Sequence, residues 1–253
     1  METVNTRDEG AVRVVELDRP DALNAFSSQL MDDLCDAFLD AAADDGVKVL
    51  LLTGKGRAFS AGADLKEMGR PPKSPKHGFA ALLDAIIDFP KPFMLAVNGM
   101  GAGIGATICG LADFVFMSEE ARLRCPFSTL GLTAEAGSTV TFPRLMGRQQ
   151  AGWFLMSSEW MSAEECRDAG LAMAVYSADD LMPQTLAKAQ HLAALPHSSL
   201  MMTKSLMMEP VRDELKAACV RENQGLASLV GSDANKEALA AFMEKREPDF
   251  SGL

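Results

Sequence analysis

The sequence is poor in basic residues, which limits the partners it can have. Its 253 residues include 24 Lys and Arg against 35 Asp and Glu, giving a formal net charge of −11. A nucleic-acid surface or a basic membrane patch needs the opposite sign of charge. We therefore expect no nucleic-acid partner and no membrane partner, and an anionic ligand would need a local basic pocket.

Long apolar runs, paired cysteines and metal-binding patterns are also lacking. No apolar run approaches the ~20 residues of a membrane span, and the start METVNTRDEG has the pattern of neither a signal peptide nor a transit helix. The five cysteines form no CxxC pair, and the three histidines have no metal-ligand spacing. HExxH, GxxxxGK[ST] and GxSxG are absent. These absences predict a cytoplasmic protein with reduced cysteines and no metal site.

Strand-like and helix-like segments alternate along the first half of the chain. A polar–apolar alternation predicts a strand at 11–20, and helical spacing of apolar residues predicts a helix within 27–46. Apolar runs bounded by turn residues predict buried strands at 47–53, 91–97 and 113–117. This alternation is typical of an α/β fold.

The second half of the chain is mostly helical by pattern. Ser162 and Glu165 form a capping-box pattern before a helix that ends at Gly170. Only 171–176 has an extended pattern. The pattern further predicts helices at 179–194, 198–208, 210–230 and 233–245.

The segment RAFSAGADLKEM (57–68) places a turn of small residues before a predicted short helix at 64–68. The first N–H groups of a helix have no intrahelical partner, so donors between Ala61 and Asp64 can hold an oxyanion. An ordinary helix N-terminus with Asp64 in its first turn explains the same residues.

The segment NGMGAGIGATICGLAD (98–113) joins a buried strand to an apolar helix through a glycine-rich bend. Glycines let a ligand or a neighbouring backbone approach closely, and the helix start again offers N–H donors. Tight helix packing is the alternative. The looser dinucleotide-binding pattern GxGxxG/A also fits this segment at Gly101, Gly103 and Ala106. In that pattern, Glu119 or Glu120 would be the acid that binds the ribose. A dinucleotide-dependent oxidoreductase is therefore a further alternative.

Glu135 is an isolated acid in the small-residue stretch GLTAEAGST (131–139). Phe127, Leu130 and Leu132 can supply apolar walls, and a carboxylate buried among them would have a raised pKa and could act as a base. A solvated or helix-capping Glu is the alternative on local sequence alone.

Four segments, in this order and spacing, closely resemble the enoyl-CoA hydratase/isomerase (crotonase) family: LDRPDALNAFS, RAFSAGADLKEM, NGMGAGIGATICGLAD and PFSTLGLTAEAGSTVTFPRLMG. The resemblance covers nearly the whole chain. It implies an α/β fold with a spiral core of ββα units, residues 1–195, and a helical C-terminal region, residues 196–253, that mediates trimer packing. It also implies an acyl-CoA substrate, no redox cofactor, and a homotrimer or dimer of trimers.

The resemblance assigns roles to individual residues. Two backbone N–H groups, of Ala63 and Ile104, would hold the thioester oxygen, and the side chain of Ile104 would have to point away from it. Further contacts with the acyl-CoA would come from Ala61, Asp64, Leu65 and Gly103. Hydratases of the family carry two glutamates, and the corresponding positions here are Thr107 and Phe127.

Without that glutamate pair, the resemblance favours the family's Δ3,Δ2-enoyl-CoA isomerases, which use one glutamate in the place of Glu135. That residue would move a proton from C2 to C4 of a 3-enoyl-CoA. Thr133 and Ala134 stand where a Pro often precedes the isomerase glutamate, so a non-catalytic acyl-CoA carrier or a weak hydratase remains an alternative. Family dehalogenases also have an acid at this position, but there Asp is expected.

Overall fold

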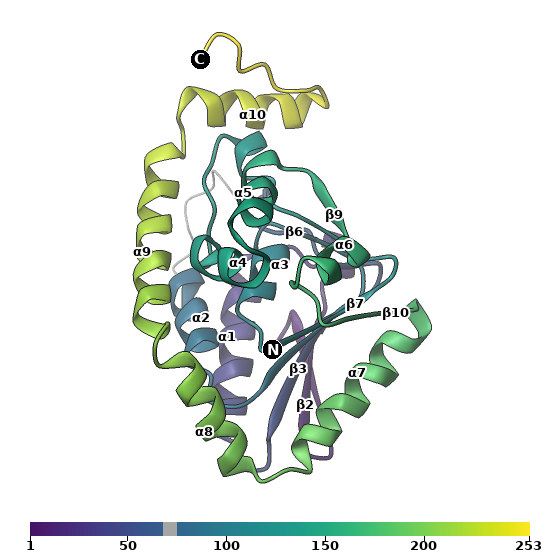
Figure 1. The fold of residues 1–253 in the computed structure, drawn as a ribbon. Helices are drawn as coiled ribbons and strands as arrows, with labels where there is room; N and C mark the ends of the chain where they lie inside the picture. Colours follow the sequence, from purple (N-terminus) through teal and green to yellow (C-terminus); the bar gives the residue numbers. More distant parts are fainter. Residues whose placement is uncertain (68–74) are drawn as a thin grey trace.

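The structure is a computed structural model that describes residues 1–67 and 75–253. Two β-sheets lie at its centre, with helices around them (Figure 1). The segment RPPKSPKHG (70–78), which is rich in Pro and Lys and is predicted from the sequence to be a mobile loop, lies mostly outside the described residues.

The larger sheet contains most of the strands predicted from the sequence. Its order is β1-β2-β3-β5-β7-β10; β1 pairs antiparallel with β2, and the other pairs are parallel. All six residues of β3 are buried, as expected for a parallel strand covered on both faces. The bounds are β1 Val4–Glu9, β2 Val12–Leu17, β3 Val49–Gly54, β5 Phe93–Val97, β7 Phe114–Ser118 and β10 Ala174–Tyr176.

A second sheet of three-residue strands has the order β4-β6-β8-β9. Each of its first three strands follows a strand of the larger sheet after a short turn, and the chain then returns through helical or irregular segments to the larger sheet. These turns form the spiral of ββα units implied by the family resemblance. Strands this short have no readable alternation, so the pattern analysis missed them: β4 Ala58–Ser60, β6 Met100–Ala102, β8 Arg122–Arg124 and β9 Trp160–Ser162.

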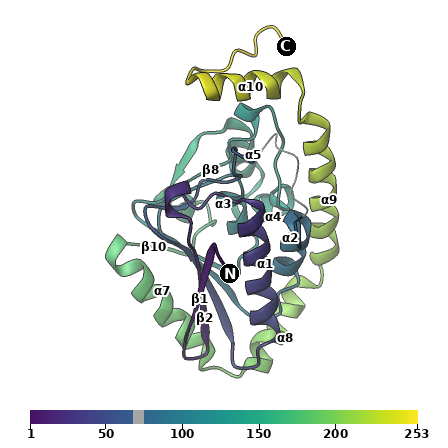
Figure 2. The same ribbon diagram turned by 180° about the vertical axis from the view of Figure 1, so that it is seen from behind.

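Helices cover both faces of the larger sheet (Figure 2). The predicted capping box is confirmed, since Ser162 and Glu165 bond reciprocally at the start of α6. The α-helices are α1 Ser28–Ala43, α2 Gly78–Ile87, α3 Ile104–Thr107, α4 Ser138–Met146, α5 Arg148–Ser157, α6 Ala163–Asp168, α7 Ala178–Ala193, α8 His197–Met208, α9 Arg212–Leu229 and α10 Asp233–Glu244; the 3₁₀ helices are η1 Pro20–Ala22, η2 Ile108–Gly110 and η3 Ser128–Leu130.

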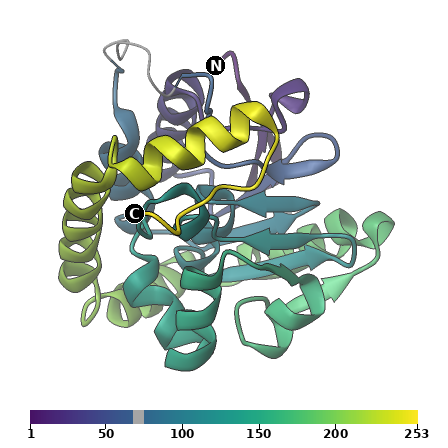
Figure 3. The same cartoon turned by 90° about the horizontal axis from the view of Figure 1, so that it is seen from above.

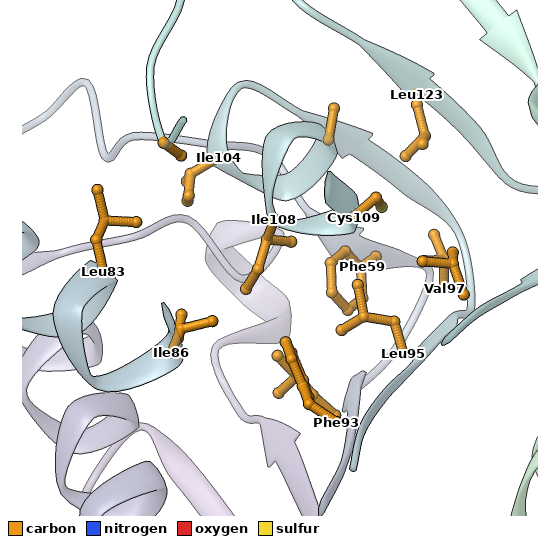
Figure 4. Close-up of a cluster of buried hydrophobic side chains, with 14 of the residues drawn as sticks. Phe59, Leu83, Ile86, Phe93, Leu95, Val97, Ile104, Ile108, Cys109 and Leu123 are labelled. Atoms are coloured by element: carbon orange, nitrogen blue, oxygen red, sulfur yellow. The ribbon is translucent and has the colours of Figure 1, made fainter. Parts of the chain in front are cut away.

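The main hydrophobic core lies between the larger sheet, the second sheet and α1 to α3. Figure 4 shows Phe59 of β4, Phe93 of β5 and Ile108 of η2 within it. Alternate residues of the larger sheet face the other way, where Leu181 and Ala189 of α7 pack against them. Because successive side chains of a strand point to opposite faces of the sheet, the same strands contribute residues to the hydrophobic clusters on both faces.

The short helix predicted at 64–68 is wrong for the residues that the structure describes. Residues 65–67 form a turn, and Met68 lies outside the described residues. Asp64 instead pairs with Phe26, since its N–H donates to the Phe26 carbonyl (3.1 Å), and its carboxylate pairs with Arg19 (3.0 Å). These long-range contacts oppose the local helix signal.

The C-terminal helices run along one side of the molecule and across one end of it (Figures 1 and 3). The buried Lys204 attaches α8 to the core through the carboxylate of Asp113 (2.7 Å) and the carbonyl of Lys91 (2.9 Å). Asn235 of α10 donates to the carbonyl of Leu130 in η3 (2.8 Å). The proposed boundary between residues 195 and 196 falls in the connection between α7 and α8, and the division into two regions stays a prediction.

Candidate active site

The backbone N–H of Ala63 lies at the turn that follows β4. Ala63 forms an isolated parallel bridge with Phe26, in which the bonds are made by the Gly62 carbonyl (2.7 Å) and the Asp64 N–H (3.1 Å). The N–H of Ala63 takes no part in this bridge. It has no hydrogen-bond acceptor among the described residues.

The backbone N–H of Ile104 is the second predicted donor and belongs to the first residue of α3. A donor at this position has no intrahelical partner, and it has no other acceptor within residues 1–67 and 75–253. The side chain of Ile104 is buried in the core, where Figure 4 shows it between Leu83 and Ile108. The donor group is therefore available although the side chain is large.

The two turns that carry these donors touch each other. A Cβ added to Gly62 would lie 2.7 Å from the Ala102 carbonyl oxygen, and one added to Gly103 would lie 3.7 Å from the Cα of Gly62. Both glycines have positive φ, 89° and 53°, which favours glycine. Because Ala63 and Ile104 directly follow them, this contact brings together the two turns that carry the free N–H groups, as an oxyanion hole requires.

The remaining residues predicted to contact acyl-CoA use their polar groups within the protein. The N–H of Ala61 donates to the Leu23 carbonyl (2.9 Å), and that of Gly103 donates to the Arg124 carbonyl (3.0 Å). Asp64 pairs with Arg19, and Leu65 is partly buried. Any acyl-CoA contact by these residues stays a prediction.

Glu135 lies in the loop between η3 and α4. Its carbonyl accepts hydrogen bonds from the N–H (3.1 Å) and the hydroxyl (2.6 Å) of Ser138. The hydroxyl of Thr107, the last residue of α3, lies near the Glu135 side chain and donates to the Gly103 carbonyl (3.3 Å). Thr107 is three residues beyond Ile104, which is about one helical turn, ~5 Å, along α3.

The pKa of Glu135 is raised from its ordinary value of 4.5 to about 8. Loss of hydration on burial is the main cause, and the negative charge of Glu222 adds to it, whereas the hydrogen bond from Thr107 opposes it. A carboxylate with this pKa is a stronger base than an ordinary glutamate and still ionises near neutral pH.

The two positions where hydratases of the family carry glutamates are apolar or neutral here. Thr107 is fully buried, and Phe127 is 6% exposed. Neither side chain can supply a carboxylate beside Glu135. The predicted site residues thus offer two backbone donors, of Ala63 and Ile104, and one candidate base, Glu135.

Glu222 of α9 is a residue of this region that the sequence analysis missed. It is 6% exposed and accepts hydrogen bonds from the N–H of Gly137 (2.6 Å) and from the N–H (3.0 Å) and hydroxyl (2.6 Å) of Thr139. An acid on the apolar face of a helix was the available signal, because Glu222 continues the helical spacing of Leu215, Ala218 and Cys219.

Two further features are absent from residues 1–67 and 75–253. No group of three or more His, Cys, Asp or Glu side chains is placed to hold a metal ion. No helix there is long and apolar enough to span a membrane.

Residues 7–252 match the family model described as enoyl-CoA hydratase/isomerase. The chain belongs to this family. Members of the family act on acyl-CoA thioesters, and the fold of this chain is the crotonase fold. The family includes both hydratases and isomerases, so membership fixes the superfamily of the enzyme and not its reaction.

Some proteins similar to this chain are named isomerases and others are named hydratases. The 1,2-epoxyphenylacetyl-CoA isomerase of Escherichia coli is 31% identical, over 100% of this chain and 99% of that protein. Enoyl-CoA delta isomerase 2 of Rattus norvegicus is 30% identical, over 94% of this chain and 62% of that protein. The crystal structure of an enoyl-CoA hydratase from Mycobacterium marinum is 50% identical with a TM-score of 0.79, over 82% of this chain and 100% of that one.

Proposed function

We propose that the protein is a Δ3,Δ2-enoyl-CoA isomerase of fatty-acid oxidation. The observation that carries the proposal is the carboxyl group of Glu135, which lies in the loop before α4 and close to Thr107 at the end of α3, the helix that begins with the Ile104 donor. The absence of carboxylates at Thr107 and Phe127 supports the same reaction.

The reaction begins when the Glu135 carboxylate removes a proton from C2 of a 3-enoyl thioester. The electron pair of the broken C–H bond delocalises onto the thioester oxygen, which accepts hydrogen bonds from the Ala63 and Ile104 N–H groups. The enolate then takes the proton back at C4, and the double bond moves from C3–C4 to C2–C3. The carboxylate is regenerated, and no water or redox partner is consumed.

Stabilisation of the enolate is necessary because an α-proton of a thioester is far less acidic than a carboxylic acid. An oxyanion-hole donor typically contributes ~3 kcal/mol, and here two are available in adjacent turns. The raised pKa of Glu135 also reduces the difference in pKa between the α-carbon of the thioester and the base that takes its proton.

Hydration makes a different demand on the site. A hydratase must orient and deprotonate water and also protonate the α-carbon, which in this family needs two glutamates. The hydroxyl of Thr107 and the ring of Phe127 cannot do this, and the apolar ring disfavours an ordered water. We therefore expect isomerisation to be much faster than hydration.

The test is conversion of 3-hexenoyl-CoA and a longer 3-enoyl-CoA to the 2-trans products, with crotonyl-CoA supplied separately to detect hydration. Turnover of the 3-enoyl substrates with little hydration supports the proposal. Hydration faster than isomerisation would identify a hydratase. Binding of the thioesters without either reaction would identify an acyl-CoA carrier.

We also propose a homotrimer, which can pair into a dimer of trimers. The C-terminal helices of the single chain expose large apolar side chains, a feature typical of surfaces that become covered by a partner. Light scattering coupled to size-exclusion chromatography gives the mass directly, and a monomeric mass would contradict the proposal. The exposed residues are Met202, Leu206, Met207, Phe242 and Met243.

A further inference from the structure

The turn that joins Glu135 to α4 has an unusual backbone. Ala136 and Gly137 both have left-handed conformations, with φ of 57° and 70°. Alanine rarely adopts this region because of its Cβ, so the surrounding contacts must hold the turn in place. The position of the Glu135 carboxyl depends on these contacts.

Glu222 supplies the side-chain contacts that hold the turn. Its two carboxylate oxygens bind the N–H of Gly137 and both donors of Thr139, which closes the N-terminus of α4. Leu215, two turns before Glu222 on the same face of α9, leaves no room for a Cβ at Gly137, which would lie 2.2 Å from the Cδ1 of Leu215. The turn after Glu135 is therefore clamped directly by α9.

The Glu222 carboxylate has no basic partner within salt-bridge distance in the part of the chain that the structure describes. It is buried, and backbone N–H groups at the start of α4 donate to it instead.

Besides Glu222, the titratable groups found near Glu135 within residues 1–67 and 75–253 are thiols that stay protonated. Cys219 of α9 has its pKa raised to about 11, chiefly by burial, and burial also raises the pKa of Cys125 well above its usual range. Asp84 of α2 influences Cys219. In the described part of the chain, Glu222 is thus the neighbouring charge that raises the pKa of Glu135.

We propose that Glu222 is a positioning residue whose carboxylate, reaching from α9, fixes the turn that carries Glu135 and sets the charge environment of the Glu135 carboxyl. This inference rests on the proposed role of Glu135 as the base. In chemical terms, a second negative charge nearby disfavours the ionised form of Glu135 and so favours proton uptake from C2.

The experiment titrates Glu135 directly in the ligand-free protein. Infrared spectra are recorded across pH 5 to 10, and the protonated-carboxyl band that is missing from Glu135→Gln is assigned to Glu135. In Glu222→Gln, which removes the charge at nearly constant size, the titration midpoint should fall by about one pH unit or more. The acid limb of kcat/KM for the 3-enoyl-CoA should fall with it.

Two further variants control for a structural effect. Thr139→Val removes one hydrogen bond to Glu222 and keeps the charge, so the midpoint should stay at the wild-type value even where the melting temperature drops. Glu222→Asp keeps the charge but withdraws it by one methylene, so the midpoint should fall less than in Glu222→Gln. If Glu222→Gln does not fold, the titration midpoints of the other two variants test the proposal: the midpoint should be lower than wild type in Glu222→Asp and unchanged in Thr139→Val.

The proposal fails if the folded Glu222 variants titrate like wild type, or if Thr139→Val lowers the midpoint as much as they do. This result does not depend on catalysis. A protein that lacks isomerase activity but shows the shifted band would contradict the proposed function alone. An active isomerase with an unshifted band would contradict the role of Glu222 alone.

Discussion

The two sides of the candidate site use different chemical groups. The oxyanion side uses backbone N–H groups of Ala63 and Ile104, in turns that pack against each other within the spiral core. The base side uses the side chain of Glu135, and its turn is held by Glu222 from a helix more than 80 residues further along the chain. The first side depends on backbone shape and the second on side-chain charge.

This difference predicts different sensitivity to substitution. A backbone donor survives every side-chain replacement except Pro, which removes the N–H. The function of a carboxylate is lost with a neutral isostere. Substitutions can therefore separate the two sides.

The largest effect should follow loss of the base. Glu135→Gln should lower kcat for the 3-enoyl-CoA by about 10²- to 10⁴-fold, the range typical of a positioned acid–base group. Binding of a CoA ligand, measured by calorimetry, should persist because the two backbone donors are unchanged. Activity close to wild type would show that Glu135 is not the base.

The oxyanion side should respond to Ile104→Pro. Proline is well tolerated at the first position of a helix, so this change removes the N–H donor with little effect on α3. We expect a loss of about 10²- to 10³-fold in kcat. Ile104→Ala, which keeps the N–H but also loses buried side-chain volume, is the matched control, and equal activity of the two variants would argue against the donor.

Stability should reveal the raised pKa of Glu135 without any substrate. Because the folded-state pKa, about 8, exceeds the ordinary value of 4.5, the group's contribution to stability is complete below pH 4.5 and is lost as pH rises through about 8. Glu135→Gln carries no such charge. The melting temperature of Glu135→Gln minus that of wild type should therefore increase as the pH rises from 4.5 to about 8. Each kcal/mol of stability that wild type loses should add ~2–4 °C to this difference. A difference that does not change with pH would contradict the raised pKa.

The smallest effect should come from Thr107, which connects the two sides. Its hydrogen bond to Glu135 favours the ionised form, so Thr107→Val should raise the pKa of Glu135 further and lower the rate at pH 7 by several-fold. Thr107→Ser retains the hydroxyl and should behave like wild type. Identical pH–rate profiles for the Val and Ser variants would exclude this role.

Features with a strong local pattern were predictable from the sequence. The strands at 47–53 and 91–97 and the Ser162 cap were confirmed because apolar runs and capping residues act over a few neighbours. The short helix at 64–68 was wrong, since Asp64 is engaged by Arg19 and Phe26, which are distant in sequence.

For the site, the sequence by itself determined the family, the α/β fold and the identity of the candidate donors and base, because these are carried by short segments with specific residue types. Only the tertiary structure decided that the turns before Ala63 and Ile104 touch, that Glu135 meets Thr107, and that a buried Glu222 clamps the adjoining turn. The physical reason is range: turn and helix preferences act locally, whereas burial and the charge of a neighbour are set by packing between distant segments.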